Sequence, residues 1–341
     1  MELKNENCNC WCRYRRFNGC YYLSKEKDVE VTVFDHGLGQ ATKAAAGIIS
    51  PWFSKRRNKA WYRMARLGAD FYQDLVSDLE NDGYDTSFYN QSGVALLKKD
   101  DSKLDALYQH AETRLEESPI IGELSIKNAA DLPEFTGFDR YLYASGGARV
   151  EGAELTATLI EASGFEKVEG PVILSPLDNG TYEINGQTFD KVILACGAWL
   201  GQTLEPLGFE VDVRPQKGQL RDYFFEGVDT GRLPVLMPEG ELDVIPFAGG
   251  KISVGASHEN DQGFDLTVDE TVLASLEEEA KTYFPDLSTA KSFSERVGTR
   301  AYTSDFSPFF GEVPELESVF VASGLGSSGL TTGPLYWKKF G

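Results

Sequence analysis

The chain has 341 residues, of which 41% are hydrophobic and 25% charged, an ordinary globular composition with length for one large domain or two smaller ones. Its 33 Lys and Arg face 53 Asp and Glu, so the formal net charge is −20 and nucleic acid or an anionic membrane is a poor partner. No apolar run reaches the roughly 20 residues of a membrane span, and the N-terminus lacks a signal-peptide pattern. These features predict a cytoplasmic protein, without a transmembrane segment, that acts on a small molecule.

The first regular segments predict strands and amphipathic helices. The valine-rich run VEVTVFD over 29–35 has strand composition and is followed by turn residues. Apolar residues recur at three- and four-residue spacing over 57–80, which predicts a helix. Strand-like pieces follow near 86–97. Helices are then expected over 100–117, with acidic residues at its start, and over 152–163, ending before a glycine.

Strands dominate the second half of the chain. The run KVILACGAW over 191–199 predicts a buried strand that ends in glycine and opens a helix, the layout of a ligand-facing crevice in an α/β sheet. Between about 209 and 300 the strand-like runs include a Gly-Gly hairpin turn and are interrupted by a helix over 267–282. A last strand covers 318–324, before a Gly/Ser turn and the start of a helix. An α/β region interrupted by a β-rich region predicts two interleaved domains.

Cysteines are concentrated at the start of the chain. Cys8, Cys10, Cys12 and Cys20 lie in the first 20 residues, and only Cys196 lies beyond them. A metal site built on C-x-C-x-C needs a second group of ligands, but the three histidines are scattered along the sequence. We therefore predict no metal site.

The segment 29–35 also resembles the second strand of a dinucleotide-binding βαβ unit, whose closing carboxylate accepts hydrogen bonds from a ribose hydroxyl. Such a unit begins with a strand and the turn G-x-G-x-x-G. The first 20 residues supply neither, and their polar, Cys-rich sequence is not expected to form a central strand.

Reading the codons of the first 20 residues one base later offers an explanation for the missing strand and turn. The codon that overlaps Trp11 and Cys12 must then encode glycine, and those that overlap 13–14 and 16–17 can encode it. The result is G-x-G-x-x-G, and its last position lies 19 residues before Asp35, close to the roughly 20 expected. Our hypothesis is that two compensating frameshifts have overwritten a phosphate-binding strand and loop.

The C-terminal residues also fit a shifted reading frame. Dropping one base in the codon of Leu335 allows Pro-Tyr-Ile-Gly-Lys, which continues a helix. The alternative at both ends is a divergent sequence read in its proper frame. Because the hypothesis covers residues 1–20 and 335–341, no redox or metal role is assigned to the cysteines of the first segment.

Six motifs in order carry a family resemblance. Together with Asp35 they are ATKAAAGIISP (41–51), KVILACGAW (191–199), RPQKGQL (214–220), ISVGAS (252–257), GTR (298–300) and SGLGSSGLTTGP (323–334). With them the sequence resembles the D-amino-acid oxidase family from about residue 21 to 334. Within the family, the sequence resembles glycine oxidase, sarcosine oxidase and D-amino acid dehydrogenase-like enzymes.

The resemblance implies an α/β fold in which an FAD-binding Rossmann-like domain is interleaved with a β-rich α+β substrate domain. The FAD-binding domain would comprise 1–82, 145–205 and 296–341. The substrate domain would comprise 83–144 and 206–295.

The resemblance also implies FAD as cofactor and assigns its contacts. The acidic residue would bind the ribose, the Ala-rich turn would approach the pyrophosphate and flavin, and the Gly/Ser turn would aim a helix N-terminus at the flavin N1–C2=O edge. The backbone of Val172 would meet the adenine, and Cys196, Gly197 and Trp199 would lie next to the cofactor, with Cys196 as a small buried hydrophobic residue and not a nucleophile. The alternatives are a solvated strand-end carboxylate for Asp35, an Ala-rich helix start for the first turn, a buried strand valine for Val172 and a plain Gly/Ser loop for the last turn. The implied residues are Asp35, His36, Ala41, Thr42, Ala46, Gly47, Ile48, Val172, Cys196, Gly197, Trp199, Gly324, Leu325, Gly326, Ser328, Gly329, Leu330 and Thr331.

For the substrate, the resemblance assigns Arg300 to the carboxylate of an amino acid, which it would grip as a bidentate fork. A surface arginine paired with an acid is the alternative. Two departures from the family pattern disfavour glycine itself: Asp243 replaces a tyrosine near the substrate, and Ser327 occupies a loop that can carry a basic residue. Asp243 could favour a substrate with a second amine.

The activity implied is hydride transfer from the α-carbon of an amine to flavin N5, giving an imine that water hydrolyses to a 2-oxo acid and ammonia or amine. No side chain is assigned as catalytic base. Oxygen or another acceptor would reoxidise the flavin, and a homo-oligomer is left open. The alternative is a non-functional or FAD-deficient product of a frameshifted gene; a flavin-dependent step on a nucleic-acid base is disfavoured by the charge.

Overall fold

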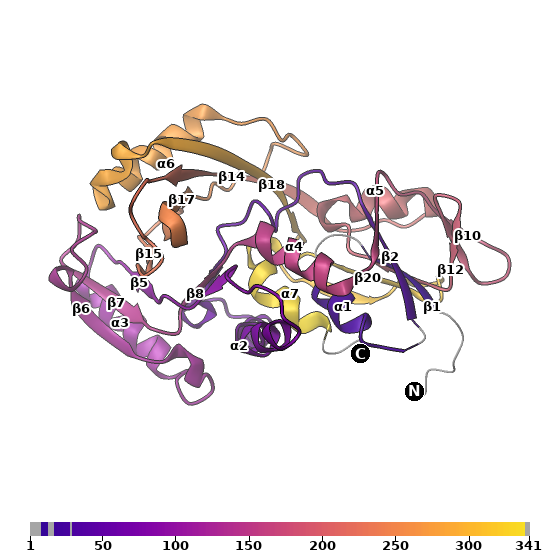
Figure 1. The fold of residues 1–341 in the computed structure, drawn as a ribbon, viewed down its shortest axis with the longest axis horizontal. Helices are drawn as coiled ribbons and strands as arrows, with labels where there is room; N and C mark the ends of the chain where they lie inside the picture. Colours follow the sequence, from indigo (N-terminus) through magenta and orange to yellow (C-terminus); the bar gives the residue numbers. More distant parts are fainter. Residues whose placement is uncertain (1–7, 13–16, 28, 338–341) are drawn as a thin grey trace.

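A computed structural model of the chain describes residues 8–12, 17–27 and 29–337. The shifted-frame hypothesis falls in part on 1–7, 13–16 and 338–341, which lie outside the described residues. The molecule has two lobes, one around the first strands and one around the long strands of the second half (Figure 1).

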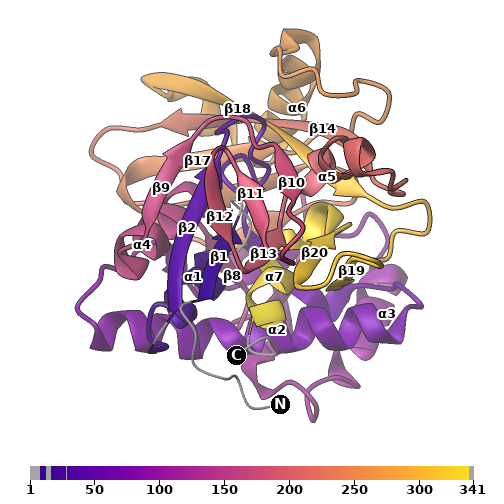
Figure 2. The same ribbon diagram turned by 90° about the vertical axis from the view of Figure 1, so that its right-hand side faces the viewer.

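The first lobe is built on a six-stranded sheet within the described residues. Its strands are β1 (Cys8–Cys12), β2 (Val29–Asp35), β9 (Glu166–Glu169), β13 (Lys191–Leu194), β19 (Phe309–Glu312) and β20 (Val319–Ser323). They pair in the order β19-β20-β13-β1-β2-β9, all parallel except β19 at the edge. A meander of β10 (Leu174–Pro176), β11 (Tyr182–Ile184) and β12 (Gln187–Phe189) lies on the near side of this sheet in Figure 2. The α/β fold expected from the sequence is therefore present.

Residues 8–12 form a central strand, so the expectation that their polar, Cys-rich sequence cannot do so is wrong. β1 pairs in parallel with β2 on one side and with β13 on the other, where Cys10 lies opposite Lys191. Main-chain N–H and C=O groups form these ladders whichever side chains are attached, and intrinsic β-propensity is weak beside that context. Helix α1 (Phe17–Leu23) follows, so β1, α1 and β2 make a βαβ unit.

The second lobe is built on an eight-stranded sheet, again counted over the described part of the chain. Its strands are β5 (Val94–Leu96), β6 (Leu124–Asn128), β7 (Arg140–Ala144), β14 (Arg214–Phe224), β15 (Val235–Met237), β16 (Asp243–Pro246), β17 (Lys251–Gly255) and β18 (Ser292–Tyr302). The order is β18-β14-β17-β16-β15-β5-β7-β6, antiparallel except between β15 and β5. A small sheet of β3 (Ile48–Ile49), β8 (Ala148–Val150) and β4 (Tyr89–Asn90) lies between the lobes.

Residue 296, where we expect the FAD-binding domain to resume, falls inside the continuous strand β18. The division into two interleaved domains stays a proposal, and its last boundary is better placed at the end of that strand.

Helices pack around both sheets. They are α2 (Lys59–Asn81), α3 (Asp101–Glu112), α4 (Gly152–Ser163), α5 (Leu200–Leu204), α6 (Glu270–Tyr283) and α7 (Gly329–Trp337). Short 3-10 turns are η1 (Pro51–Phe53), η2 (Pro119–Ile121), η3 (Ala129–Asp131), η4 (Gly197–Trp199), η5 (Glu205–Leu207), η6 (Ala248–Gly250), η7 (Pro285–Thr289) and η8 (Gly326–Ser328). In the described ranges no helix is both long and apolar enough to cross a bilayer.

Capping residues decide where the expected helices begin. α2 starts two residues later than the apolar spacing predicts, because the Asn58 side chain accepts a hydrogen bond from the N–H of Trp61 at 3.0 Å. α6 starts at Glu270 because the Asp269 side chain accepts hydrogen bonds from the N–H groups of Thr271 and Val272. α4 has the predicted bounds, and Gly164 ends it in the left-handed conformation.

α2 connects the two lobes through its apolar face. It buries Phe71, Tyr72, Leu75 and Leu79 in a core that also contains side chains of β2, β5 and β15. Each fully buried large apolar side chain contributes about 1.5–3 kcal/mol. In Figure 1 the helix is seen end-on between the lobes, beside α7.

Candidate active site

A cavity of about 650 Å³ is lined from both lobes, within the roughly 300–1,000 Å³ of small-molecule sites. The first lobe contributes the segment after β2 and the turn after β20. The second contributes residues of β14, β16 and β18. The cavity therefore lies at the carboxyl ends of parallel strands, where α/β folds bind ligands.

Of the residues that the sequence assigned to the cofactor or substrate, twelve line this cavity: Ala41, Thr42, Ala46, Gly47, Ile48, Asp243, Arg300, Gly326, Ser328, Gly329, Leu330 and Thr331. Ser327 lines it as well. Eight do not line it: Asp35, His36, Val172, Cys196, Gly197, Trp199, Gly324 and Leu325. The first set holds both residues expected at the substrate and most of those expected beside the flavin, but not Gly324 and Leu325 of the Gly/Ser turn. The second set holds those expected at the ribose and adenine, together with residues that pack behind the cavity wall.

Asp35 ends β2 with its carboxylate buried. The carboxylate accepts hydrogen bonds from the side-chain Nε2 of Gln40 at 2.7 Å and the N–H of Gly37 at 3.0 Å, and Lys167 Nζ lies at 3.8 Å. It is thus no isolated surface carboxylate.

Cys196 and its neighbours support the cavity from behind. Cys196 is buried in an apolar core, as expected of a small hydrophobic residue. The Gly197 carbonyl accepts a hydrogen bond from Ser323 Oγ at 2.9 Å, which joins the ends of β13 and β20. Trp199 packs so closely against Gly39 that a Cβ there would lie 2.4 Å from the indole ring.

The segment 41–48 forms a wall of main chain and small side chains. Gly47 has a φ of +81°, and a Cβ there would lie 2.0 Å from the Val150 carbonyl oxygen. A Cβ on Gly298 would lie 2.8 Å from the Cβ of Ala44. Because only methyl groups and backbone face the cavity from 44–46, this wall fits the close approach of a flat ring such as a flavin.

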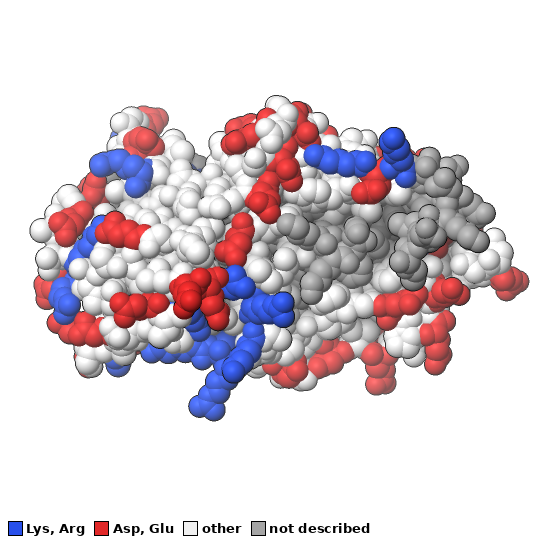
Figure 3. All heavy atoms as spheres, turned by 90° about the horizontal axis from the view of Figure 1, so that it is seen from below, with Lys and Arg blue, Asp and Glu red and all other residues white. Residues whose placement is uncertain are grey.

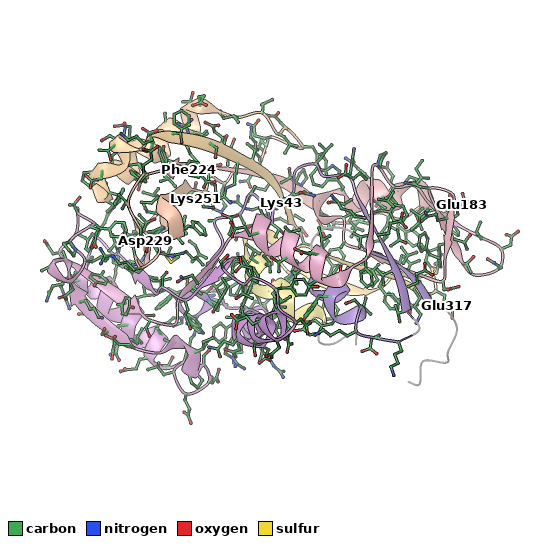
Figure 4. The ribbon with its side chains drawn as sticks, viewed as in Figure 1. Lys43, Glu183, Phe224, Asp229, Lys251 and Glu317 are labelled. Carbon is green, nitrogen blue, oxygen red and sulfur yellow. The ribbon has the colours of Figure 1, made fainter. Side chains whose placement is uncertain are left out.

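Arg296, which the sequence did not single out, holds that wall in place. Its Nη1 donates to the carbonyls of Lys43 and Ala45, both at 3.1 Å, and its Nη2 pairs with Asp222 at 2.8 Å. Glu151 lies 3.5 Å from the same guanidinium and also binds Lys251, which Figure 4 labels together with Lys43. This buried ionic network ties the wall to β14, β17 and β18.

Helix α2 fixes the turn that precedes α7. Trp61 Nε1 donates to Ser328 Oγ at 3.2 Å, and the Tyr72 hydroxyl donates to the Leu330 carbonyl at 2.8 Å. On the other side, the Ser327 N–H donates to the Tyr302 hydroxyl at 3.0 Å. The N-terminus of α7 is thus held at the cavity, where its positive end favours negative charge.

Arg300 lies deep in the cavity, on β18. Its Nη1 donates to the Ser257 carbonyl at 2.7 Å and to Gln216 Oε1 at 3.2 Å, while Nη2 makes no hydrogen bond within the described part of the chain. Burial lowers the pKa of this guanidinium from its ordinary value. The group is not a surface arginine paired with an acid, and it is oriented to bind an anion.

Gly218 makes room for this guanidinium. A Cβ at that position would lie 2.6–2.7 Å from three of its atoms. We expect Gly218→Ala to displace Arg300 and to weaken binding of carboxylate ligands roughly 10²-fold, the effect of a misplacement of about 1 Å. Gly201→Ala is the matched control, because nothing lies within 4 Å of a Cβ there. Dissociation constants beside melting temperatures test this, and equal constants for the two variants would contradict it.

Asp243 faces the same cavity from β16. Within the described residues its carboxyl group has no hydrogen bond or ion pair, and burial raises its pKa to about 8. The group is therefore mainly protonated at pH 7. In that state it donates a hydrogen bond and does not act as a counter-ion.

His258 and Glu241 also line the cavity, and sequence reasoning missed both. His258 Nδ1 lies 3.7 Å from a Glu241 carboxylate oxygen. Burial and the nearby positive charge of Arg300 lower the pKa of this histidine. Its place directly after the motif ISVGAS was the available signal, but a histidine in a loop is uninformative before the loop is placed.

Comparisons with known proteins agree on one family. The family model described as FAD dependent oxidoreductase (DAO) matches residues 20–336. The chain is 38% identical over 329 residues to YurR, an uncharacterized oxidoreductase of Bacillus subtilis, covering 92% of this chain and 88% of that protein. It is 29% identical over 321 residues to a glycine oxidase of Pseudomonas aeruginosa, covering 90% and 85%. The crystal structure of iminodiacetate oxidase from Chelativorans sp. BNC1 matches with a TM-score of 0.90 at 28% identity, covering 97% and 93%.

Proposed function

The chain belongs to the family of FAD dependent oxidoreductases (DAO), and from this premise we propose that it oxidises the C–N bond of a small amino acid or secondary amine. The observation that carries the proposal is the placement of Arg300 in one cavity with the segment 41–48 and the N-terminus of α7. A carboxylate held by the arginine would place its α-carbon beside the wall where the flavin ring fits.

FAD, when bound, supplies the acceptor for the hydride that leaves the substrate α-carbon. The segment 41–48 and the turn 326–331 would hold its ring. Arg300 binds the carboxylate and fixes the direction of the α-C–H bond. Water then hydrolyses the released imine to a 2-oxo acid and ammonia or amine. No side chain needs to act as a base if the amine binds in its neutral form.

The names of the relatives support both parts of the substrate class. Glycine oxidase is named for a primary amino acid, and iminodiacetate oxidase for a secondary amine with two carboxylates. The departures at Asp243 and Ser327 disfavour glycine itself. Among these substrates we therefore favour a secondary amine.

The test is anaerobic reduction of the FAD-loaded protein, measured as the loss of flavin absorbance. Glycine, sarcosine, iminodiacetate and D-alanine form the panel. We expect at least one secondary amine to bleach the flavin within seconds to minutes. Stoichiometric FAD that none of these amines reduces would overturn the proposed function.

A further inference from the structure

The outer part of the cavity is basic, although the protein as a whole carries a net charge of −20. Lys55, Arg56, Lys98 and Lys103 line the same cavity as Arg300. The first two lie between η1 and α2, Lys98 follows β5, and Lys103 lies in the first turn of α3. Two parts of the sequence, 55–56 and 98–103, thus place cations at one opening.

The basic character extends around the start of α2. Between 55 and 66 the sequence contains six Lys or Arg and no acidic residue. Figure 3 shows a band of Lys and Arg that crosses the middle of one face, with acidic residues on either side. An anion near this opening is therefore attracted locally, despite the overall negative charge.

The carboxylates at the opening do not cancel these cations. Glu239 accepts a hydrogen bond from the Lys99 N–H at 3.4 Å and lies 3.5 Å from Lys103 Nζ, and these contacts lower its pKa. It therefore compensates one lysine. Glu241 lies 3.7 Å from His258 Nδ1 and also attracts Arg300. These two carboxylates therefore face five Lys or Arg side chains in the same cavity.

Three cations, Lys55, Arg56 and Lys98, form no ion pair within the described residues. The described residues give Lys55 no ion pair or hydrogen bond. Arg56 stacks on the Trp61 ring, with 4.6 Å between guanidinium carbon and ring centroid, a contact that keeps its charge. The carboxylate of Glu239 attracts both Lys98 and Lys103, but Lys98 forms no ion pair of its own in the described part of the chain.

Asp243 does not reverse this balance at neutral pH. Its protonated carboxyl group offers a hydrogen-bond donor to an acidic group and attracts a second ammonium group only weakly. This argues against a substrate with a second amine, the class that the residue type alone suggested.

We infer that the substrate carries a second acidic group, which lies against Lys98 and the neighbouring cations while Arg300 holds the α-carboxylate. The inference rests on the proposed function and narrows its substrate class to acidic amino acids or secondary amines with two carboxylates. Because the outer cations are partly exposed, the preference should weaken as ionic strength rises.

Three thioethers that have sulfur in place of the amine on the α-carbon test binding separately from turnover. Thiodiacetate has two carboxylates, methylthioacetate has one, and (2-aminoethylthio)acetate replaces the second with an amine. Isothermal titration calorimetry on the full chain, with and without added FAD, gives their dissociation constants. We expect thiodiacetate to bind at least roughly tenfold more tightly than methylthioacetate at low salt, and the aminoethyl compound to bind most weakly.

Lys98→Glu and Lys99→Glu form a matched pair of variants. The two residues are adjacent and undergo the same charge change, but only Lys98 lines the cavity. The preference for thiodiacetate should disappear in the first variant and persist in the second. Equal affinities for the three compounds, a preference for the aminoethyl compound, equal behaviour of the two variants, or no binding at all would overturn the inference.

Turnover measurements distinguish failure of the inferred anion subsite from failure of the proposed oxidation. If thiodiacetate is preferred but no amine reduces bound FAD, the anion subsite stands and the oxidation does not. If sarcosine and iminodiacetate reduce the flavin equally well and thiodiacetate is not preferred, the oxidation stands and the subsite does not.

Discussion

Replacing Arg300 with methionine is expected to raise the KM for a carboxylate substrate by roughly 10²-fold or more. Loss of one partner of a buried charged pair costs about 2–5 kcal/mol, and every 1.4 kcal/mol is about tenfold in affinity. Because the guanidinium is anchored through Nη1 to Gln216 and Ser257, its free face is already directed at the cavity. Steady-state kinetics with the FAD-loaded protein measure the change.

The control variants separate charge from geometry. Arg300→Lys keeps a positive charge but loses the planar fork, so we expect it to recover only part of the affinity. Arg232→Met removes an exposed arginine that pairs with Glu134 on the surface, and it should leave KM unchanged. Unaltered KM in both Arg300 variants would show that the substrate carboxylate binds elsewhere.

A chain whose first residues follow the shifted reading frame is expected to bind FAD stoichiometrically, whereas the present sequence should bind it at least roughly 10²-fold more weakly. The restored glycines would let backbone N–H groups and the N-terminus of α1 contact the pyrophosphate. Each hydrogen bond to a charged group contributes about 1.5–3 kcal/mol, so the loss of two accounts for the difference. Flavin absorbance spectra and FAD titrations of both purified proteins test this.

The structure makes this comparison direct, since β1, α1 and β2 already form a βαβ unit in the present chain. Restoring the frame would change side chains and the turn, and not the strand order. A protein whose reading frame is restored only over 335–341 is the matched control, and it should bind FAD as weakly as the present sequence. A stoichiometric yellow complex of the present sequence would refute the prediction, and no flavin binding by either form would count against FAD itself.

The sequence predicted the elements whose pattern is local. Strand β2 has the bounds of its valine-rich run, and α4 those of the apolar segment before Gly164. These succeed because side-chain periodicity and a terminal glycine act over a few residues. The error at β1 has the opposite cause, since pairing between two parallel strands determined its conformation and its own side chains did not.

Motifs in order were sufficient to indicate the family, the FAD cofactor and Arg300 as a candidate, because each motif needs a particular backbone or charge at one position. Tertiary structure alone decided what surrounds that arginine. Gly218 beside its guanidinium, the protonated Asp243, Arg296 behind the wall 41–48, and Lys98 at the opening come from strands and loops far apart in the chain. The charge state of a buried carboxyl group and the sign of the electrostatic potential in a cavity depend on which groups folding places within a few ångströms. No local sequence pattern encodes those distances.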